Sequence, residues 1–339
     1  MIKTALSLWT APKKPTKTWE GLFASRVVIY IAIILLAALV AYAYQLRTGT
    51  IFSCQADGYN TDQYLAYCQG AHYADYEHGA FYFDLEPSVQ DHVRDTDVLF
   101  LGTSRLQFAF STAATADWFA SASAHYYLMG FTYFEDVVFA EKLLRKIQPR
   151  AKVYVINVDG FFDRSETSPV RAILHDPEAR HRYEAKRHWQ RVHEPVCKAL
   201  AAFCGHKTVI FRSRETGAYS MELAASEQKI IPVSYDQDVD QGLVASNTAA
   251  AVDFLSEFTQ GKCVILTSVP LVETKIGNSN AIAAGLGMKL TAPEILEGLQ
   301  TFDGFHLDQP SAERWSQSFF RIAGPEIRSC LERQTTAHS

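Results

Sequence analysis

The sequence predicts an α/β fold with a parallel sheet, preceded by one N-terminal transmembrane helix. Two observations carry this prediction. Short apolar runs of strand length alternate with stretches of helical periodicity, which is the pattern of a parallel sheet with right-handed crossover connections. Before them, residues 27–44 form an uncharged apolar run, and about 18 such residues suffice to cross a bilayer.

The chain is long enough for one substantial globular domain and an appendage. It has 339 residues, of which 48% are hydrophobic and 20% are charged, so a packed core is feasible. The net charge of −5 is mild, which argues against a generic nucleic-acid-binding protein.

The apolar run 27–44 predicts an uncleaved anchor in the inner (cytoplasmic) membrane. The basic residues that precede it are Lys3, Lys13, Lys14, Lys17 and Arg26. Acidic residues are frequent over residues 57–86, so the positive-inside rule places residues 1–26 in the cytoplasm and the main domain in the periplasm. A cleaved signal peptide is the alternative, because residues 41–43 (AYA) form a small-x-small cleavage pattern. Both interpretations export the main domain.

We divide the chain into four parts. Residues 1–26 are a cytoplasmic tail, residues 27–45 the anchor, residues 46–95 a tyrosine-rich membrane-proximal connector, and residues 96–330 the α/β domain. An insertion over about residues 161–253 interrupts the α/β rhythm. Such a long connection is uncommon without a function or structure of its own, so we interpret it as an insertion beside the active site that forms a lid or a partner surface.

The parallel sheet is predicted from four apolar runs. The expected strands cover residues 98–101, 125–128, 152–158 and 262–270, with no clear fifth strand. The expected helices cover residues 106–110, 134–147, 248–258, 293–299 and 312–322. Residues 230–235 fit a strand or an extended loop, and residues 273–290 predict a mobile loop rich in Gly, Asn and Ala.

A charged helix is predicted within the insertion, over residues 175–193. His181 and His188 are seven residues apart and would share one of its faces. They are a candidate metal pair, but no acidic ligand accompanies them, so a solvated helix is the favoured interpretation. No cysteine spacing resembles a zinc site, and no metal or cofactor is expected.

The six cysteines are consistent with an exported domain, because disulfides persist outside the cytosol. Cys54 and Cys68 flank a short polar stretch, and Cys197 and Cys204 flank another, so each pair is expected to form a local bridge. Cys263 begins an apolar strand and is expected to be a buried thiol. The sequence alone leaves the connectivity open, since six cysteines allow about 15 pairings.

Ser104 follows the first predicted strand and is a candidate nucleophile. The strand stops at Gly102, and an apolar pattern that predicts a helix resumes after Ser104. This arrangement places Ser104 at the carboxyl edge of a parallel sheet, where open α/β sheets bind ligands. The alternative is a helix N-cap, a role for which serine is among the commonest residues.

A candidate base lies near the C-terminus. Asp303 and His306 are three residues apart, just before the final predicted helix. In a turn, this spacing lets the carboxylate accept from one ring nitrogen while the other faces the serine. The alternative is an exposed loop in which the aspartate makes a turn.

Together these blocks resemble the SGNH (GDSL-like) hydrolase superfamily over roughly residues 95–325. That superfamily has a serine after the first strand, oxyanion-hole Gly and Asn residues after the next two, and Asp-x-x-His near the end. Here Gly102, Thr103 and Ser104 stand where the superfamily has Gly-Asp-Ser, so Thr103 replaces the aspartate. Gly130 matches the second-block glycine, and Asn157 is the asparagine nearest to the third block.

The resemblance implies a three-layer α/β/α fold with a flavodoxin-like sheet. It assigns Ser104 as nucleophile, His306 as base and Asp303 as the acid that orients it, with Gly130 and Asn157 in the oxyanion hole. The branch it indicates is membrane-anchored and extracytoplasmic, and resembles periplasmic alginate acetylation proteins and the lipoteichoic-acid D-alanylation protein. The implied partners are an acylated surface glycan and a multispanning membrane acyltransferase.

These residues favour an exported serine esterase or O-acyltransferase that acts on acyl groups of a surface glycan. The alternative is a non-catalytic SGNH-like scaffold or glycan-binding subunit of an envelope biosynthesis complex. A phosphatase or nuclease ranks below both, because the sequence has no cluster of metal ligands.

Overall fold

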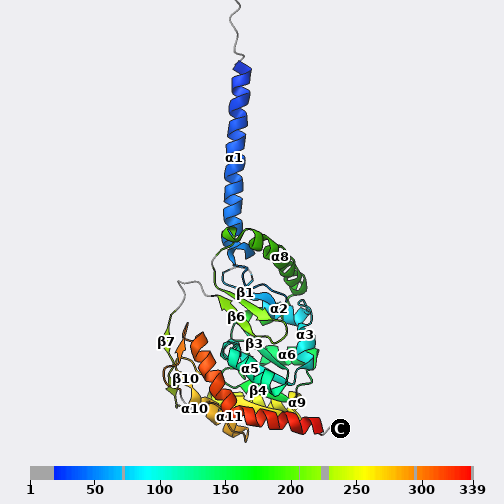
Figure 1. The fold of residues 1–339 in the computed structure, drawn as a ribbon, viewed down its shortest axis with the longest axis vertical. Coiled ribbons are helices and arrows are strands. Elements are labelled where there is room, and N and C mark those ends of the chain that lie inside the picture. Colours follow the sequence, from blue (N-terminus) through cyan, green and yellow to red (C-terminus); the bar gives the residue numbers. More distant parts are fainter. Residues whose placement is uncertain (1–18, 71–72, 206, 223–228, 294–295, 337–339) are drawn as a thin grey trace, which may run out of the picture.

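A long N-terminal helix projects from the folded body of the protein (Figure 1). The computed structural model describes residues 19–70, 73–205, 207–222, 229–293 and 296–336. Helix α1 (Trp19–Gly49) begins earlier than the predicted anchor, so the described part of the expected tail is helical, and residues 1–18 lie outside the described residues. Its segment Arg26–Gly49 is long and apolar enough to cross a membrane, and no residue of its most apolar stretch is buried.

Four parallel strands form the central sheet, as the alternation of apolar runs predicts. The strands are β2 (Val98–Thr103), β3 (Tyr126–Phe131), β4 (Val153–Asn157) and β9 (Cys263–Thr267). Their order across the sheet is β3-β2-β4-β9, and all three adjacent pairs are parallel. Every residue of β2 and β4 is buried, which explains why both read as unbroken apolar runs.

Alternate side chains of the sheet belong to two separate hydrophobic clusters. Leu99 and Leu101 lie in one cluster, whereas Val98 and Phe100 lie in the other. The first cluster includes residues of α6 (Val137–Ile147) and α9 (Gln241–Phe258). The second includes residues of α4 (Ser104–Phe110), α5 (Ala113–Ala122) and α11 (Gln309–Thr336). Helices therefore bury both faces of β2.

A second, antiparallel sheet combines the predicted connector with the predicted insertion. Its strands are β1 (Gln63–Cys68), β5 (Val209–Ser213) and β6 (Tyr219–Glu222), in the order β1-β5-β6. In Figure 1, β1 and β6 lie between α1 and the parallel strands. The two segments that the sequence suggested as separate parts therefore share one sheet.

A buried arginine joins this second sheet to the first. The Arg212 side chain of β5 is fully buried and pairs with Glu77 at 2.9 Å. Its guanidinium also donates to the carbonyl oxygens of Leu128 and Gly130, at 2.7 and 3.0 Å. The two buried charges therefore neutralise each other, although Nε of Arg212 has no hydrogen-bond partner among the described residues.

The remaining elements are short, apart from the charged helix α8. They are η1 (Ile51–Ser53), α2 (Tyr76–Phe83), α3 (Val89–Asp95), α7 (Ser168–His175), α8 (Ala179–Ala199), η2 (Ala201–Phe203), β7 (Ile231–Pro232), β8 (Tyr235–Asp236), β10 (Thr274–Lys275), α10 (Ile276–Gly285) and β11 (Gln300–Thr301).

Two local predictions differ from the structure. Residues 273–290 contain α10 rather than only a loop, because burial of Ile282 and Ala283 outweighs the weak helix propensity of the surrounding Gly and Asn residues. The helix predicted over residues 293–299 is not formed in the described part of that range, which contains only a turn.

Three disulfides join the six cysteines. Cys54–Cys68 and Cys197–Cys204 are the two local bridges that the sequence predicts. The prediction of a thiol at Cys263 is wrong, because Cys263 is bonded to Cys330. The predicted final helix stopped at residue 322, whereas α11 continues past Cys330 and brings it beside β9.

Candidate active site

Ser104 lies at the carboxyl end of the parallel sheet, where β2 passes directly into α4. β2 ends at Thr103, α4 begins at Ser104, and Ser104 is only 4% exposed. The Thr103 hydroxyl accepts a hydrogen bond from the Arg105 N–H at 3.2 Å, so Thr103 is the N-cap of α4. The alternative role of Ser104 as N-cap is therefore wrong, and its hydroxyl is left for another partner.

Gly102 allows this abrupt change from strand to helix. A Cβ atom at this position would lie 2.8 Å from Cβ of Leu106 and 3.1 Å from Cβ of Asn157. Both distances are shorter than a normal contact between carbon atoms. Glycine therefore lets α4 and the end of β4 approach the backbone beside Ser104.

Ser104, His306 and Asp303 form a continuous hydrogen-bonded chain. Oγ of Ser104 lies 2.8 Å from Nε2 of His306, and Nδ1 of His306 lies 2.7 Å from Oδ2 of Asp303. With Asp303 accepting from Nδ1–H, Nε2 is left to accept from the serine hydroxyl. The structure thus brings together the three residues that the sequence singled out, in the order of a nucleophile, a base and an orienting carboxylate.

The loop before α11 fixes the relative positions of Asp303 and His306. Oδ1 of Asp303 accepts from the backbone N–H groups of Phe305 and His306, both at 2.9 Å. Gly304 has φ +92° in this turn, a conformation that residues with a side chain rarely adopt, and its N–H donates to Oγ1 of Thr301 at 3.0 Å. The carboxylate is therefore held by the same turn that presents the imidazole.

The surroundings of the pair favour an ionised carboxylate. Burial by itself raises the pKa of Asp303. The hydrogen bond and charge of His306 lower this pKa, as do the backbone N–H groups of Phe305 and His306. Their combined effect is larger, so the pKa of Asp303 falls below its ordinary value of 3.8. The His306 ring stacks on Phe302, with centroids 5.5 Å apart, and lies 4.7 Å from the Phe108 ring. Asp303 is thus an acceptor at neutral pH, beside an imidazole that two aromatic rings confine.

The three residues open into a cavity of about 430 Å³. Its other polar lining residues include Gln69, Thr132 and Thr208, and its apolar lining residues include Phe108, Ile210, Met221 and Phe302. The second sheet contributes Thr208 through the chain before β5, Ile210 from β5 and Met221 from β6. The insertion therefore forms a wall of the candidate active site, which agrees with its predicted place beside that site.

Asn157 ends β4 next to this site. It is fully buried, its Oδ1 accepts from the Val269 N–H at 2.9 Å, and its Cβ lies close to Gly102. Among the described residues, its Nδ2 group has no hydrogen-bond partner. An unpaired buried donor costs about 1–3 kcal/mol. Asn157 is not among the residues that line the cavity, so its role as an oxyanion donor stays a prediction.

Gly130 occupies the position opposite Gly102 in the register between β2 and β3. Its N–H donates to Oε1 of Gln107 at 3.0 Å, and Nε2 of Gln107 donates to the carbonyl of Gly217. Gly130 would therefore have to exchange Gln107 for a substrate oxygen before it could donate in an oxyanion hole. Its catalytic role stays a prediction.

An ion pair beside Ser104 escaped the sequence analysis. The guanidinium of Arg105 pairs with the carboxylate of Asp159, two residues beyond Asn157. Burial raises the pKa of Asp159, and the charge and hydrogen bond of Arg105 oppose that rise. Both residues follow strands whose carboxyl ends meet at one sheet edge, and this is the signal in the sequence that could have indicated the pair.

The two histidines that the sequence raised as a metal pair lie on α8 in the insertion. Both His181 and His188 are exposed on α8, in agreement with a solvated helix. A different group, His193 with Cys197 and Cys204, is compact enough to hold a metal ion. Its two cysteines are joined by a disulfide, so they offer no thiolate ligands.

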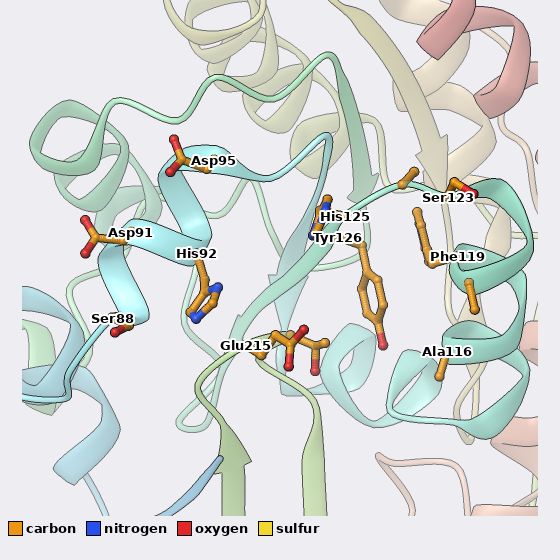
Figure 2. A pocket seen from close by; sticks show the side chains of 13 residues that line it. Ser88, Asp91, His92, Asp95, Ala116, Phe119, Ser123, His125, Tyr126 and Glu215 are labelled. Carbon is orange, nitrogen blue, oxygen red and sulfur yellow. The ribbon is translucent and has the colours of Figure 1, made fainter. Parts of the chain in front are cut away.

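A second cavity, of about 720 Å³, lies beside the start of β3, at the opposite end of this strand from Gly130. Figure 2 shows His92 on α3 and Tyr126 on β3 around it, with Glu215 from the turn between β5 and β6. It contains no serine paired with a histidine among its described lining residues. The smaller cavity therefore remains the candidate active site, because Ser104 and His306 line it.

Comparison with known proteins finds no relative of this chain: no protein-family model, no curated protein and no solved structure matches it. The chemistry of the site must therefore be argued from the geometry of its own residues.

Proposed function

We propose that the protein is a membrane-anchored serine esterase or O-acyltransferase that uses Ser104, His306 and Asp303. The observation that carries this proposal is the hydrogen-bonded chain from Ser104 Oγ through the His306 ring to Asp303. Its distances are within the range of a nucleophile and base poised for proton transfer. The cavity around it leaves room for an acyl ester.

In the proposed reaction, Ser104 Oγ attacks the acyl carbonyl carbon while its proton passes to Nε2 of His306. Asp303 balances the positive charge that forms on the imidazole and holds its tautomer. His306 then returns the proton to the departing alcohol oxygen, which leaves Ser104 acylated. Water completes a hydrolysis and a sugar hydroxyl completes a transfer. In each case the acceptor gives its proton to His306 as it attacks the acyl carbon, and His306 passes that proton to Oγ of Ser104 as the acyl–serine bond breaks.

The negative charge on the carbonyl oxygen requires hydrogen-bond donors. We assign this role to Nδ2 of Asn157, together with Gly130 once Gln107 has moved aside. The unpaired state of Nδ2 among the described residues supports the first assignment. One such donor typically contributes about 10²–10³ in kcat.

The fold is consistent with membership of the SGNH superfamily. The strand order β3-β2-β4-β9 and the two hydrophobic clusters favour a three-layer, flavodoxin-like arrangement. Thr103 stands where the superfamily has an aspartate. It is the N-cap of α4, so the residue at this position still has a structural role.

We further propose an inner-membrane protein with its catalytic domain in the periplasm. The apolar segment Arg26–Gly49 supports the anchor, and the charge asymmetry around it supports the orientation. The substrate would be an acylated surface glycan and the partner a multispanning acyltransferase, by analogy of fold and site. Alkaline phosphatase fused after Ser339 should be active, and an inactive fusion would contradict this orientation.

The second candidate is a non-catalytic scaffold or glycan-binding subunit. The engagement of the Gly130 N–H by Gln107 favours it, because a preorganised oxyanion hole would leave that donor free. A fluorophosphonate probe separates the two, since it bonds only to an activated serine. We expect labelling at Ser104 that disappears in Ser104→Ala, whereas an unlabelled, correctly folded wild type would favour the scaffold.

A further inference from the structure

A third cavity lies where α1 meets the folded body of the protein. It has a volume of about 770 Å³ and is separate from the candidate active site, although Tyr133 lines both. One side of it is formed by the end of α1, with Tyr42 and Leu46, and another by α8, with Ala185 and Trp189. Figure 1 shows α8 beside the lower end of α1.

The position of this cavity along α1 matches the surface of a bilayer. The apolar segment of α1 ends at Gly49, which itself lines the cavity. Tyr42 and Tyr44 are 60% and 68% exposed near that end, and tyrosines are enriched at both interfaces of a membrane. If α1 crosses a bilayer, the cavity opens at the level of the lipid head groups.

Helix α8 has the composition of a helix that lies on a membrane. Its basic residues are Arg180, Arg182, Lys186, Arg187, Arg191 and Lys198, against the acids Glu184 and Glu194. Trp189 is 51% exposed and Val192 46% exposed, so α8 presents apolar side chains as well as basic ones to its surroundings. Basic residues combined with exposed Trp and aliphatic side chains are typical of interfacial helices.

The lining of the cavity changes from apolar to charged. Leu46, Phe52 and Trp189 lie on its apolar side, and the ring centroids of the two aromatic residues are 6.4 Å apart. Arg182 and Lys186 provide its positive charge, and Asp75 contributes one negative charge. Lys186 pairs with the partly buried Asp75, whereas Arg182 pairs with Asp176 while half exposed, and an exposed pair of this kind contributes little energy. Arg182 is therefore the cation that can turn towards a ligand at small cost.

We propose that this membrane-side cavity binds an anionic phospholipid of the bilayer that α1 spans. The phosphate would lie at Arg182 and Lys186, and an acyl chain along Leu46 and Trp189. Continuity with the end of α1 favours a lipid over a soluble ligand, and the basic excess of α8 favours an anionic head group. Because Tyr133 lines both cavities, the bound lipid would lie next to the candidate active site. The proposal rests on the membrane anchor but not on the proposed catalysis.

The test uses the full-length protein in phosphatidylcholine vesicles that contain photoreactive phosphatidylglycerol. We expect crosslinks on α8 and η1. Arg182→Gln should weaken phosphatidylglycerol binding about fivefold, the effect of one basic residue near a membrane surface. Arg180→Gln removes the same charge from the same helix outside the cavity and should leave the crosslinks unchanged. Ala185→Trp should fill the cavity and remove most of the crosslinking.

Equal crosslinking of the Arg182→Gln and Arg180→Gln variants would overturn the proposal, as would full crosslinking of a folded Ala185→Trp variant. Thermal melting establishes folding, and Arg182→Gln decides the outcome if the larger substitution unfolds the protein. Flotation with the vesicles tests the membrane anchor independently of the crosslinks. A protein that does not float with the vesicles would contradict both the anchor and the lipid site. Ester hydrolysis measured in detergent is independent of both results.

Discussion

Nε2 of His306 lies 2.8 Å from Oγ of Ser104, although 202 residues separate the two in the chain. The parallel sheet brings Ser104 to its carboxyl edge, and the loop after β11 places His306 over that edge. The hydrogen bond requires both β2 and the packing of α11 against α4, which the second hydrophobic cluster provides. A substitution that displaces α11 should therefore disturb the Ser104–His306 hydrogen bond even if it lies outside the candidate active site.

Asp303→Asn should make acid unfolding less steep. The pKa of Asp303 is lowered in the folded protein, so its ionised form stabilises the fold above the ordinary value of 3.8. That contribution is lost as the pH falls through the lower, folded-state pKa. The difference in free energy of unfolding between wild type and variant should be constant at neutral pH and shrink below pH 3.8. Denaturant unfolding across pH measures it, and a difference independent of pH would contradict the carboxylate's role.

Gly304→Ala should reduce both stability and turnover. The position has φ +92°, so an alanine there carries about 1–3 kcal/mol of strain and would shift the turn that holds Asp303 and His306. Gly287→Ala is the matched control, because Gly287 has φ +67° with nothing within 4 Å of an added Cβ, outside the candidate site. Both variants should melt at lower temperature, and only Gly304→Ala should lose kcat. Equal turnover of the two folded variants would show that the turn does not position the base.

Asn157→Ala should lower kcat by about 10²–10³ and leave KM nearly unchanged, because an oxyanion donor acts on the transition state. The substitution also removes the acceptor of the Val269 N–H, so some loss of stability is expected. Steady-state kinetics corrected for the folded fraction separates the two effects. Reduced melting temperature with unchanged kcat would assign Asn157 a structural role only.

Removing the Cys263–Cys330 bridge should destabilise the protein more than removing a local one. The bridge spans 67 residues, for which the loss of loop entropy predicts about 4 kcal/mol. Cys197–Cys204 spans 7 residues and predicts about 2 kcal/mol. Double Cys→Ala variants of each pair, unfolded in denaturant, test this. A larger loss for the short loop would contradict the entropic explanation.

The parallel strands could be predicted because burial on both faces leaves a local trace, an unbroken apolar run such as residues 98–101. The antiparallel pairing of β1 with β5 left no such trace, because it joins residues far apart in the chain. The bridge from Cys263 to Cys330 could not be predicted for the same reason. It forms because α11 continues beyond the predicted end of the final helix.

The site divides in the same way. Ser104, Asp303 and His306 carry recognisable chemistry at recognisable places, a strand end and a turn, so the sequence could indicate them. Thr208, Ile210 and Met221 are ordinary residues of a distant sheet, and only the folded arrangement makes them walls of the cavity. The engagement of the Gly130 N–H by Gln107 likewise depends on packing rather than on pattern.

The most direct test of the proposed catalytic unit is the turnover of p-nitrophenyl acetate by wild type, Ser104→Ala, His306→Ala and the double variant, each checked for folding by thermal melting. Each single substitution should remove nearly all turnover, and the double variant should be little worse than either, because residues that act as one unit are strongly non-additive. A folded Ser104→Ala variant as active as the wild type would contradict the assignment of Ser104 as the nucleophile.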